Sequence, residues 1–189
     1  MEIAVIGLGL IGGSICKAIK KNTNHVIYGF DIDRNVIDAA LEALAINDTL
    51  NDKDLYKADI TFVCLYPMET ITYIKNNIKN FKKGSIVCDV CGIKKYITDE
   101  LEDILNQSGI NFIGTHPMAG KEFSGYDYSD DKIFEKASFI ITETSNSSKD
   151  AIKQVETLAK EMGFAKIVFS TPAEHDRIIS FTSQLAHVV

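Results

Sequence analysis

Strand-like and helix-like segments alternate along the chain, and this alternation constrains the fold more than any other feature of the sequence. Short runs rich in β-branched residues are separated by longer segments whose apolar residues recur at helical spacing. Strands are predicted at residues 2–6, 25–30, 60–65, 85–90, 111–114, 137–142 and 166–169, and helices at residues 11–21, 33–44, 67–78, 93–106, 151–162 and 171–189. Such alternation builds right-handed βαβ units. We therefore predict an α/β fold with a doubly wound, mostly parallel sheet that helices cover on both faces.

Composition excludes several classes of protein. The 189 residues are 46% hydrophobic and 24% charged, which is ordinary for a folded domain. No apolar run approaches the roughly 18 residues that span a membrane. The net charge of −6 and the scattered lysine pairs argue against a nucleic-acid partner. Met1 leads into a strand without a signal-peptide pattern, and the four cysteines do not form a secreted disulfide framework, so we expect a cytoplasmic protein.

A glycine-rich turn directly follows the first predicted strand and opens the first predicted helix. It reads Gly-Leu-Gly-Leu-Ile-Gly-Gly-Ser at residues 7–14. In a Rossmann-type dinucleotide-binding turn, one glycine permits the tight turn, a second lets the backbone approach the pyrophosphate, and a third allows close helix–strand packing. Gly7, Gly9 and Gly12 fit these roles, and the helix N-terminus supplies free N–H groups. A glycine-rich turn without a ligand is the less favoured interpretation.

An acidic residue at the end of the second predicted strand indicates which dinucleotide is bound. Asp31 follows Gly12 by 19 residues and can accept hydrogen bonds from both ribose hydroxyls, while its charge would repel a 2′-phosphate. We therefore expect NAD, with NADP less favoured; Arg34, which could meet a 2′-phosphate, is the argument for NADP. The expected cofactor-binding residues are Gly7, Leu8, Gly9, Leu10, Ile11, Gly12, Asp31, Arg34, Leu65, Tyr66 and Pro67.

The long connection at residues 115–136 holds the candidate catalytic residue. His116 follows the fifth predicted strand, near the carboxyl edge of the sheet where doubly wound folds bind ligands. Its imidazole can accept a proton near neutral pH, as the oxidation of an alcohol requires. The alternative is a structural histidine on a polar loop. Glu122 and Ser124 either orient His116 and contact substrate or make hydrogen bonds within the loop.

The last predicted helix has a polar stripe opposite an apolar one. The stripe consists of Asp176, Ser180, Ser183 and His187. Two hydroxyls and an imidazole favour a functional stripe, with a solvated face as the alternative. The chain then ends on apolar residues without a helix cap, which suggests that the natural chain continues. We expect a dinucleotide-binding domain at residues 1–170 and the start of a second domain at residues 171–189.

Two cysteines have the Cys-x-x-Cys spacing that occurs in pairs in zinc sites. Cys88 and Cys91 are not accompanied by a second pair, and residues three apart on a strand point to opposite faces. We therefore expect buried or site-lining thiols and no metal.

In this order, the motifs closely resemble those of the prephenate dehydrogenase family, which includes arogenate dehydrogenases. The resemblance runs from Met1 to Val189. It rests on the glycine turn, Tyr-Gly-Phe-Asp at residues 28–31, Cys-Gly-Ile-Lys at 91–94, His-Pro-Met-Ala-Gly-Lys-Glu-Phe-Ser-Gly at 116–125, and Pro-Ala-Glu-His-Asp-Arg at 172–177 followed by Ser-Gln-Leu-Ala-His-Val-Val. The histidine loop is specific to this group, whereas many dehydrogenases share the glycine turn. Family members continue into a helical dimerisation domain.

The resemblance implies oxidative decarboxylation of prephenate to 4-hydroxyphenylpyruvate in tyrosine biosynthesis, with hydride transfer to NAD. His116 would take or hydrogen-bond the proton of the ring hydroxyl. The residues expected at the substrate are His187, Glu122, Ser124, Ser183 and Lys94. A homodimer would need the helical domain.

Two departures from the family pattern bear on activity. The family often has Gly-Ser-Val-Lys where this chain has Cys-Gly-Ile-Lys, so Gly92 replaces a serine that helps orient the histidine or the substrate hydroxyl. The family's carboxylate-binding arginine lies in the helical domain. We therefore expect this chain to bind cofactor but to turn prephenate over poorly by itself. An arogenate dehydrogenase and a module that senses NAD without catalysis stay open as alternatives.

Overall fold

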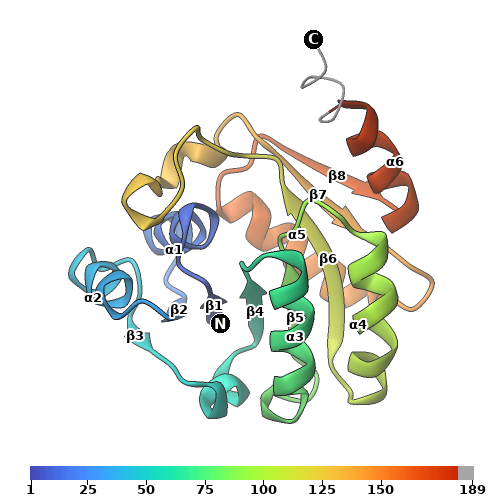
Figure 1. Ribbon diagram of the computed structural model, residues 1–189, viewed down its shortest axis with the longest axis horizontal. Coiled ribbons are helices and arrows are strands. Elements are labelled where there is room, and N and C mark those ends of the chain that lie inside the picture. The colour runs from blue at the N-terminus through green and yellow to red at the C-terminus, as the bar shows by residue number, and fades with distance from the viewer. Residues whose placement is uncertain (183–189) are drawn as a thin grey trace.

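Eight strands form one sheet in the computed structural model, which describes residues 1–182 (Figure 1). The strands are β1 (Glu2–Ile6), β2 (Val26–Phe30), β3 (Asp48–Thr49), β4 (Ile60–Val63), β5 (Ile86–Asp89), β6 (Asn111–Pro117), β7 (Ser138–Thr142) and β8 (Lys166–Ser170). Their order across the sheet is β3-β2-β1-β4-β5-β6-β7-β8. Neighbouring strands run parallel except for β6 and β7, so the predicted mostly parallel sheet is confirmed.

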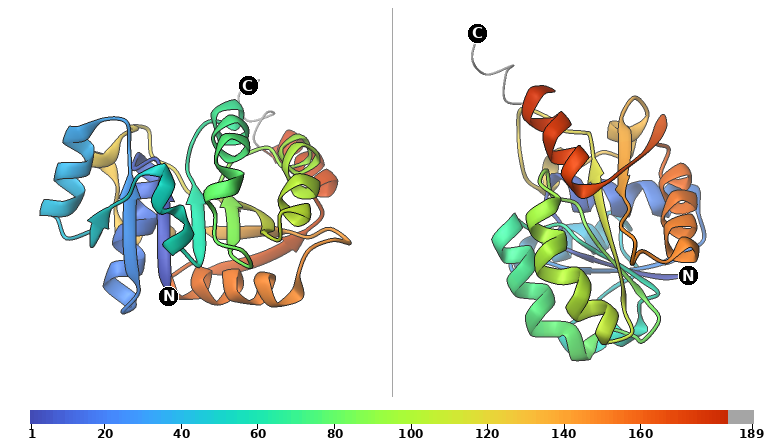
Figure 2. Two further views of the ribbon diagram at one scale, coloured as in Figure 1. Left: turned by 90° about the horizontal axis from the view of Figure 1, so that it is seen from below. Right: turned by 90° about the vertical axis from the view of Figure 1, so that its right-hand side faces the viewer.

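Helices cover both faces of the sheet, as predicted (Figure 2). They are α1 (Leu10–Asn22), α2 (Arg34–Glu42), α3 (Pro67–Asn77), α4 (Lys95–Gln107), α5 (Lys149–Glu161) and α6 (Pro172–Thr182). Helices α1, α2 and α5 pack on one face, and α3 and α4 pack on the other. The Asp33 side chain caps α2 by accepting from the Asn35 N–H, and Pro67 occupies the first turn of α3. None of the described helices is long and apolar enough to cross a membrane.

Each face of the sheet buries its own apolar layer. Strand β4 is buried along its whole length, with Phe62 in one layer and Val63 in the other. This explains its continuous apolar sequence, which is typical of a strand covered on both faces. Cys88 and Cys91 likewise pack in different layers, and both are free thiols.

Some local elements differ from the prediction. The two-residue strand β3 and the 3₁₀ helix Asp52–Lys57 were not predicted, because such short elements leave no periodic signal. Strand β6 is longer than predicted and continues to Pro117. Asp89 at the end of β5 pairs with Gly114, and beyond that point β7 alone continues the ladder with β6. His116 therefore lies on a paired strand and not on a loop.

Candidate active site

A cavity of about 550 Å³ opens at the carboxyl ends of β1 and β4. The strand order reverses between these two neighbours, because the chain builds outward from β1 to β3 and then returns to the other side of β1. Doubly wound folds bind ligands at such a switch point. Most of the expected cofactor residues line this cavity, namely Gly7, Gly9, Leu10, Ile11, Gly12, Asp31, Leu65 and Tyr66.

The three glycines of the turn meet three different steric conditions. Gly7 has a φ of +86°, in the region that L side chains rarely adopt. A Cβ on Gly12 would lie 1.9 Å from the Gly7 carbonyl oxygen, so the start of α1 packs too closely for any side chain. A Cβ on Gly9 would meet no atom within 4 Å, so the backbone there is open to a ligand. These are the conditions that the sequence motif requires.

The Asp31 carboxylate is tied to the glycine turn. Its Oδ2 accepts from the Leu8 N–H at 2.8 Å, and its Oδ1 accepts from the Asp33 N–H at 3.0 Å. A carboxylate has about four acceptor sites, so Asp31 keeps capacity for further hydrogen bonds in the cavity that it lines.

Three expected cofactor residues do not line the cavity with their side chains. Leu8 is fully buried in the core, so its backbone N–H makes its contact with the site. Arg34 is largely exposed and pairs with Asp38, with 2.9 Å between Nε and Oδ1. Pro67 begins α3 next to the cavity-lining Tyr66.

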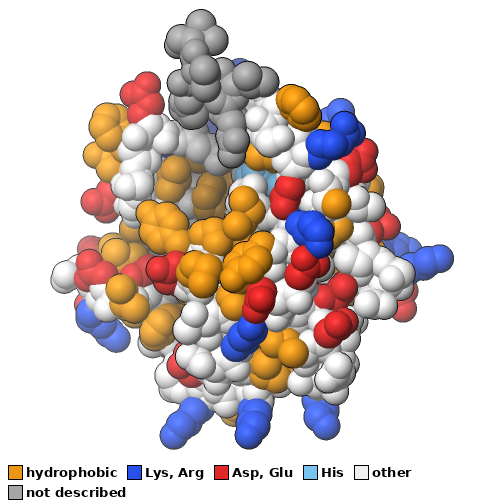
Figure 3. Space-filling model, turned by 45° about the vertical axis from the view of Figure 1, so that its right-hand side comes forward, with side chains coloured by type: hydrophobic (Ala, Val, Ile, Leu, Met, Phe, Trp, Pro, Cys, Tyr) orange, Lys and Arg blue, Asp and Glu red, His pale blue; other side chains and the backbone are white. Residues whose placement is uncertain are grey.

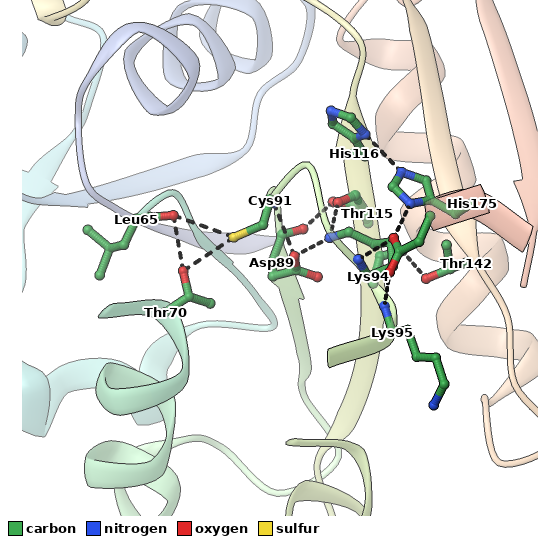
Figure 4. A network of polar contacts seen from close by, with 12 residues as sticks. Leu65, Thr70, Asp89, Cys91, Lys94, Lys95, Thr115, His116, Thr142 and His175 are labelled. Carbon is green, nitrogen blue, oxygen red and sulfur yellow. Dashed lines mark hydrogen bonds and ion pairs between the residues drawn. The ribbon is translucent and has the colours of Figure 1, made fainter. Parts of the chain in front are cut away.

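His116 stands beyond the carboxyl end of β5, beside the loop that follows that strand. Its Nδ1 lies 2.9 Å from the Nε2 of His175. A dashed line in Figure 4 marks this contact. A Cβ on Gly92 would lie 3.7 Å from its Nε2. Burial, the charge of Lys94 and the neighbouring His175 lower the pKa of His116 to about 4. The imidazole is therefore neutral at pH 7 and can accept a proton.

His175 and Asp176, in the first turns of α6, complete the surroundings of His116. The His175 Nδ1 lies 2.8 Å from the Asp176 Oδ1. Asp176 also accepts from the backbone N–H groups of Lys94 and Lys95, at 2.7 and 2.9 Å. The sequence placed Asp176 on a polar stripe but did not single out His175, which is buried. A histidine next to that aspartate, in the segment at residues 172–177, was the available signal.

The side chain of Lys94, which was expected at the substrate, is fully buried. It forms an ion pair with the equally buried Asp89, and its Nζ donates to the Thr115 carbonyl at 2.7 Å. The Thr115 hydroxyl donates to the Asp89 carbonyl at 2.5 Å. Lys94 therefore joins β5 to the part of β6 that carries His116.

The remaining expected substrate residues are dispersed. Ser124 lines the cofactor cavity, and Glu122 is exposed on the segment before it. Ser183 and His187 lie outside the described residues. On the face seen in Figure 3, hydrophobic side chains gather beside a recess in which histidine surface is visible.

This geometry is that of a dinucleotide-binding domain with a histidine at the carboxyl edge of the same sheet. The chain belongs to the family of the prephenate dehydrogenase nucleotide-binding domain, whose model matches residues 15–169.

Curated relatives agree with this assignment over almost the whole chain. Prephenate dehydrogenase of Bacillus subtilis is 33% identical over 191 residues, which are 99% of this chain and 51% of the relative. Cyclohexadienyl dehydrogenase of Zymomonas mobilis is 30% identical over 193 residues, covering 100% of this chain and 64% of the relative. The chain thus spans about half to two thirds of the length of these relatives.

Solved structures give the same result. Arogenate dehydrogenase of Synechocystis superposes with a TM-score of 0.91 at 27% identity. Prephenate dehydrogenase of A. aeolicus in complex with hydroxyphenyl propionate and NAD⁺ superposes with a TM-score of 0.90 at 26% identity. Each match covers 100% of this chain and 66% of the solved chain.

Proposed function

We propose that this chain is the cofactor-binding part of an NAD-dependent dehydrogenase that oxidatively decarboxylates prephenate to 4-hydroxyphenylpyruvate. The observation that carries the proposal is the neutral His116, whose Nε2 lies beside Gly92, two residues after the cavity-lining Val90. A related structure holds hydroxyphenyl propionate and NAD⁺ together. The position of His116 suits a base that acts on a ring substrate next to the cofactor.

The cavity suits NAD. The open backbone at Gly9 and the first N–H groups of α1, which no Gly9 side chain caps, would hold the pyrophosphate. Asp31 would accept from the adenosine ribose. When bound, NAD supplies the hydride acceptor.

His116 carries the proton chemistry. Its Nε2 accepts the hydroxyl proton as the ring carbinol becomes a carbonyl, and it can return that proton to the same oxygen when loss of the carboxylate converts the ring to a phenol. Asp176, two hydrogen bonds away, offsets the positive charge that develops on the imidazole.

The test is His116→Asn in the complete protein that carries this chain. We expect turnover with prephenate to fall by about 10²- to 10⁴-fold, while NAD affinity measured by calorimetry stays the same. His25→Asn, far from the cavity, is the matched control. Turnover within ten-fold of the wild type in His116→Asn would contradict the proposal. A wild-type protein that binds NAD but oxidises neither prephenate nor arogenate would instead be a module that senses NAD without catalysis.

Arogenate is the second candidate substrate. It is favoured by the similarity to the Synechocystis arogenate dehydrogenase and the Zymomonas mobilis cyclohexadienyl dehydrogenase. The ratio of kcat/KM values for prephenate and arogenate decides between them.

We also propose that residues 1–170 form the cofactor domain, with a helical, dimerising domain beginning at residue 171. Dimerisation of the complete protein, but not of residues 1–170, is the expected result in sedimentation.

A further inference from the structure

The polar contacts of His116 continue into α6 as a line of three side chains (Figure 4). His116 Nδ1 lies 2.9 Å from His175 Nε2, and His175 Nδ1 lies 2.8 Å from Asp176 Oδ1. His175 is only 1% exposed, so water does not compete for its two ring nitrogens. The protonation of each member therefore determines what its neighbour can donate or accept.

The carboxylate sets the direction of these hydrogen bonds. Burial acts to raise the pKa of Asp176, but the hydrogen bonds from His175 and from the backbone N–H groups of Lys95 and Lys94 together lower it below its ordinary value. Asp176 is thus ionised at neutral pH and can only accept. His175 must then carry a proton on Nδ1 and donate it to Asp176.

The direction of this hydrogen bond determines the tautomer of both imidazoles. Burial lowers the pKa of His175 in spite of its hydrogen bond to Asp176, so the ring is neutral and has one N–H. With that N–H at Nδ1, the Nε2 of His175 is an acceptor and takes a hydrogen bond from the His116 Nδ1–H. The neutral His116 is left with an unprotonated Nε2, the atom closest to Gly92.

We propose that His175 and Asp176 are positioning residues that hold His116 in the tautomer whose Nε2 is free to accept a proton. The inference rests on the proposed function, because the tautomer has a catalytic consequence only if His116 is the base. Among residues 1–182, the other charges that act on the two imidazoles are those of Lys94 and Asp89, which form an ion pair with each other. Neither supplies an acceptor to His116, so neither can set its tautomer.

Nitrogen NMR of the ¹⁵N-histidine-labelled chain tests the tautomer directly. In the wild type at pH 7 we expect His116 to have a protonated Nδ1 and an unprotonated Nε2. His175→Leu removes the acceptor, and we expect His116 to shift towards protonation at Nε2. His175→Gln offers an amide oxygen in place of Nε2 and is expected to restore the wild-type tautomer. His25→Gln, which alters a histidine paired with Glu161, is the matched control.

Turnover of the complete protein gives the second readout. We expect His175→Leu to lower kcat by about 10²-fold or more, with NAD affinity retained; in the serine-protease triad, a histidine held in the wrong tautomer lowers kcat by about 10⁴-fold. His175→Gln is expected to regain at least ten-fold of the lost kcat. A wild-type His116 protonated at Nε2, or a folded His175→Leu variant with an unchanged tautomer, would overturn the inference. The wild-type spectrum decides even if His175→Leu does not fold. Loss of turnover in His116→Asn alongside an unaffected His175→Leu variant would reject the positioning role alone, whereas retained turnover in His116→Asn would reject the proposed function.

Discussion

Gly92 and His116 face each other across the carboxyl edge of the sheet, with 3.7 Å between the Cβ position of the glycine and Nε2 of the imidazole. Gly92 is exposed, and its φ is not in the left-handed region, so a small side chain fits there without strain. The hydroxyl of a serine at this position would lie next to the His116 Nε2, where the proposed function requires the substrate hydroxyl to bind.

Gly92→Ser is therefore expected to be a gain-of-activity variant. One additional hydrogen bond to the substrate hydroxyl is worth about 1 kcal/mol, so kcat/KM should rise by about five-fold. Gly92→Ala fills the same space without a hydroxyl and should show no gain. Steady-state kinetics of both variants in the complete protein make the comparison, and equal rates for the two would contradict the prediction.

Two alanine substitutions in the glycine turn should affect different properties, NAD binding at Gly9 and stability at Gly12. Gly9→Ala places its methyl group in open space, so we expect unchanged stability and at least ten-fold weaker NAD binding. Gly12→Ala forces a methyl group against the Gly7 carbonyl oxygen, and overpacking of this kind costs about 1–3 kcal/mol or more. Urea unfolding and calorimetric titration of the two variants measure the two effects. An equally destabilised Gly9→Ala would contradict the assignment of its free space to a ligand.

His116 makes the native state sensitive to acid. Its pKa is about 4 in the folded chain and near 6.5 when unfolded, so between these values the unfolded state binds more protons. The contribution to stability is fully present above about pH 6.5 and is lost as the pH falls towards 4, by about 3 kcal/mol. Urea unfolding between pH 7 and 4 should show a shallower pH dependence in His116→Gln. Parallel curves for variant and wild type would be inconsistent with this pKa.

The buried Asp89–Lys94 pair is expected to be costly to break and less costly to replace. Lys94→Gln leaves the Asp89 carboxylate buried without its partner, which costs about 3–5 kcal/mol. The double variant Asp89→Asn with Lys94→Gln removes both charges at similar volume and should be more stable than the single one. The double variant should also raise the pKa of His116, because the charge of Lys94 is one of the causes that lower this pKa. An NMR titration of His116 with an unchanged midpoint would argue against that electrostatic link.

The sequence predicted the long elements well, because their apolar periodicity extends over several turns. The starts of α2 and α3 also followed from local chemistry at Asp33 and Pro67. The extension of β6 could not be predicted in this way, since it depends on pairing with β7 and includes Pro117, a residue that is unfavourable in most strands.

The site was predictable where its residues are consecutive. The glycine turn and His116 belong to short motifs, whereas the contact between His116 and His175 joins residues 59 positions apart. The burial of Lys94 was equally inaccessible, because lysines are rarely fully buried unless paired, and its partner Asp89 becomes apparent only when the loop after β5 is folded.

The three donors that converge on Asp176 limit which side chains this position tolerates. Its two oxygens serve the N–H groups of Lys94 and Lys95 together with the His175 ring. Asparagine offers one oxygen and an NH₂ group that would oppose one of these donors. A substitution at position 176 would therefore have to keep both the contacts to the N–H groups at the start of α4 and the contact to the His175 ring. Aspartate alone among the common residues has the length and the lone pairs for both.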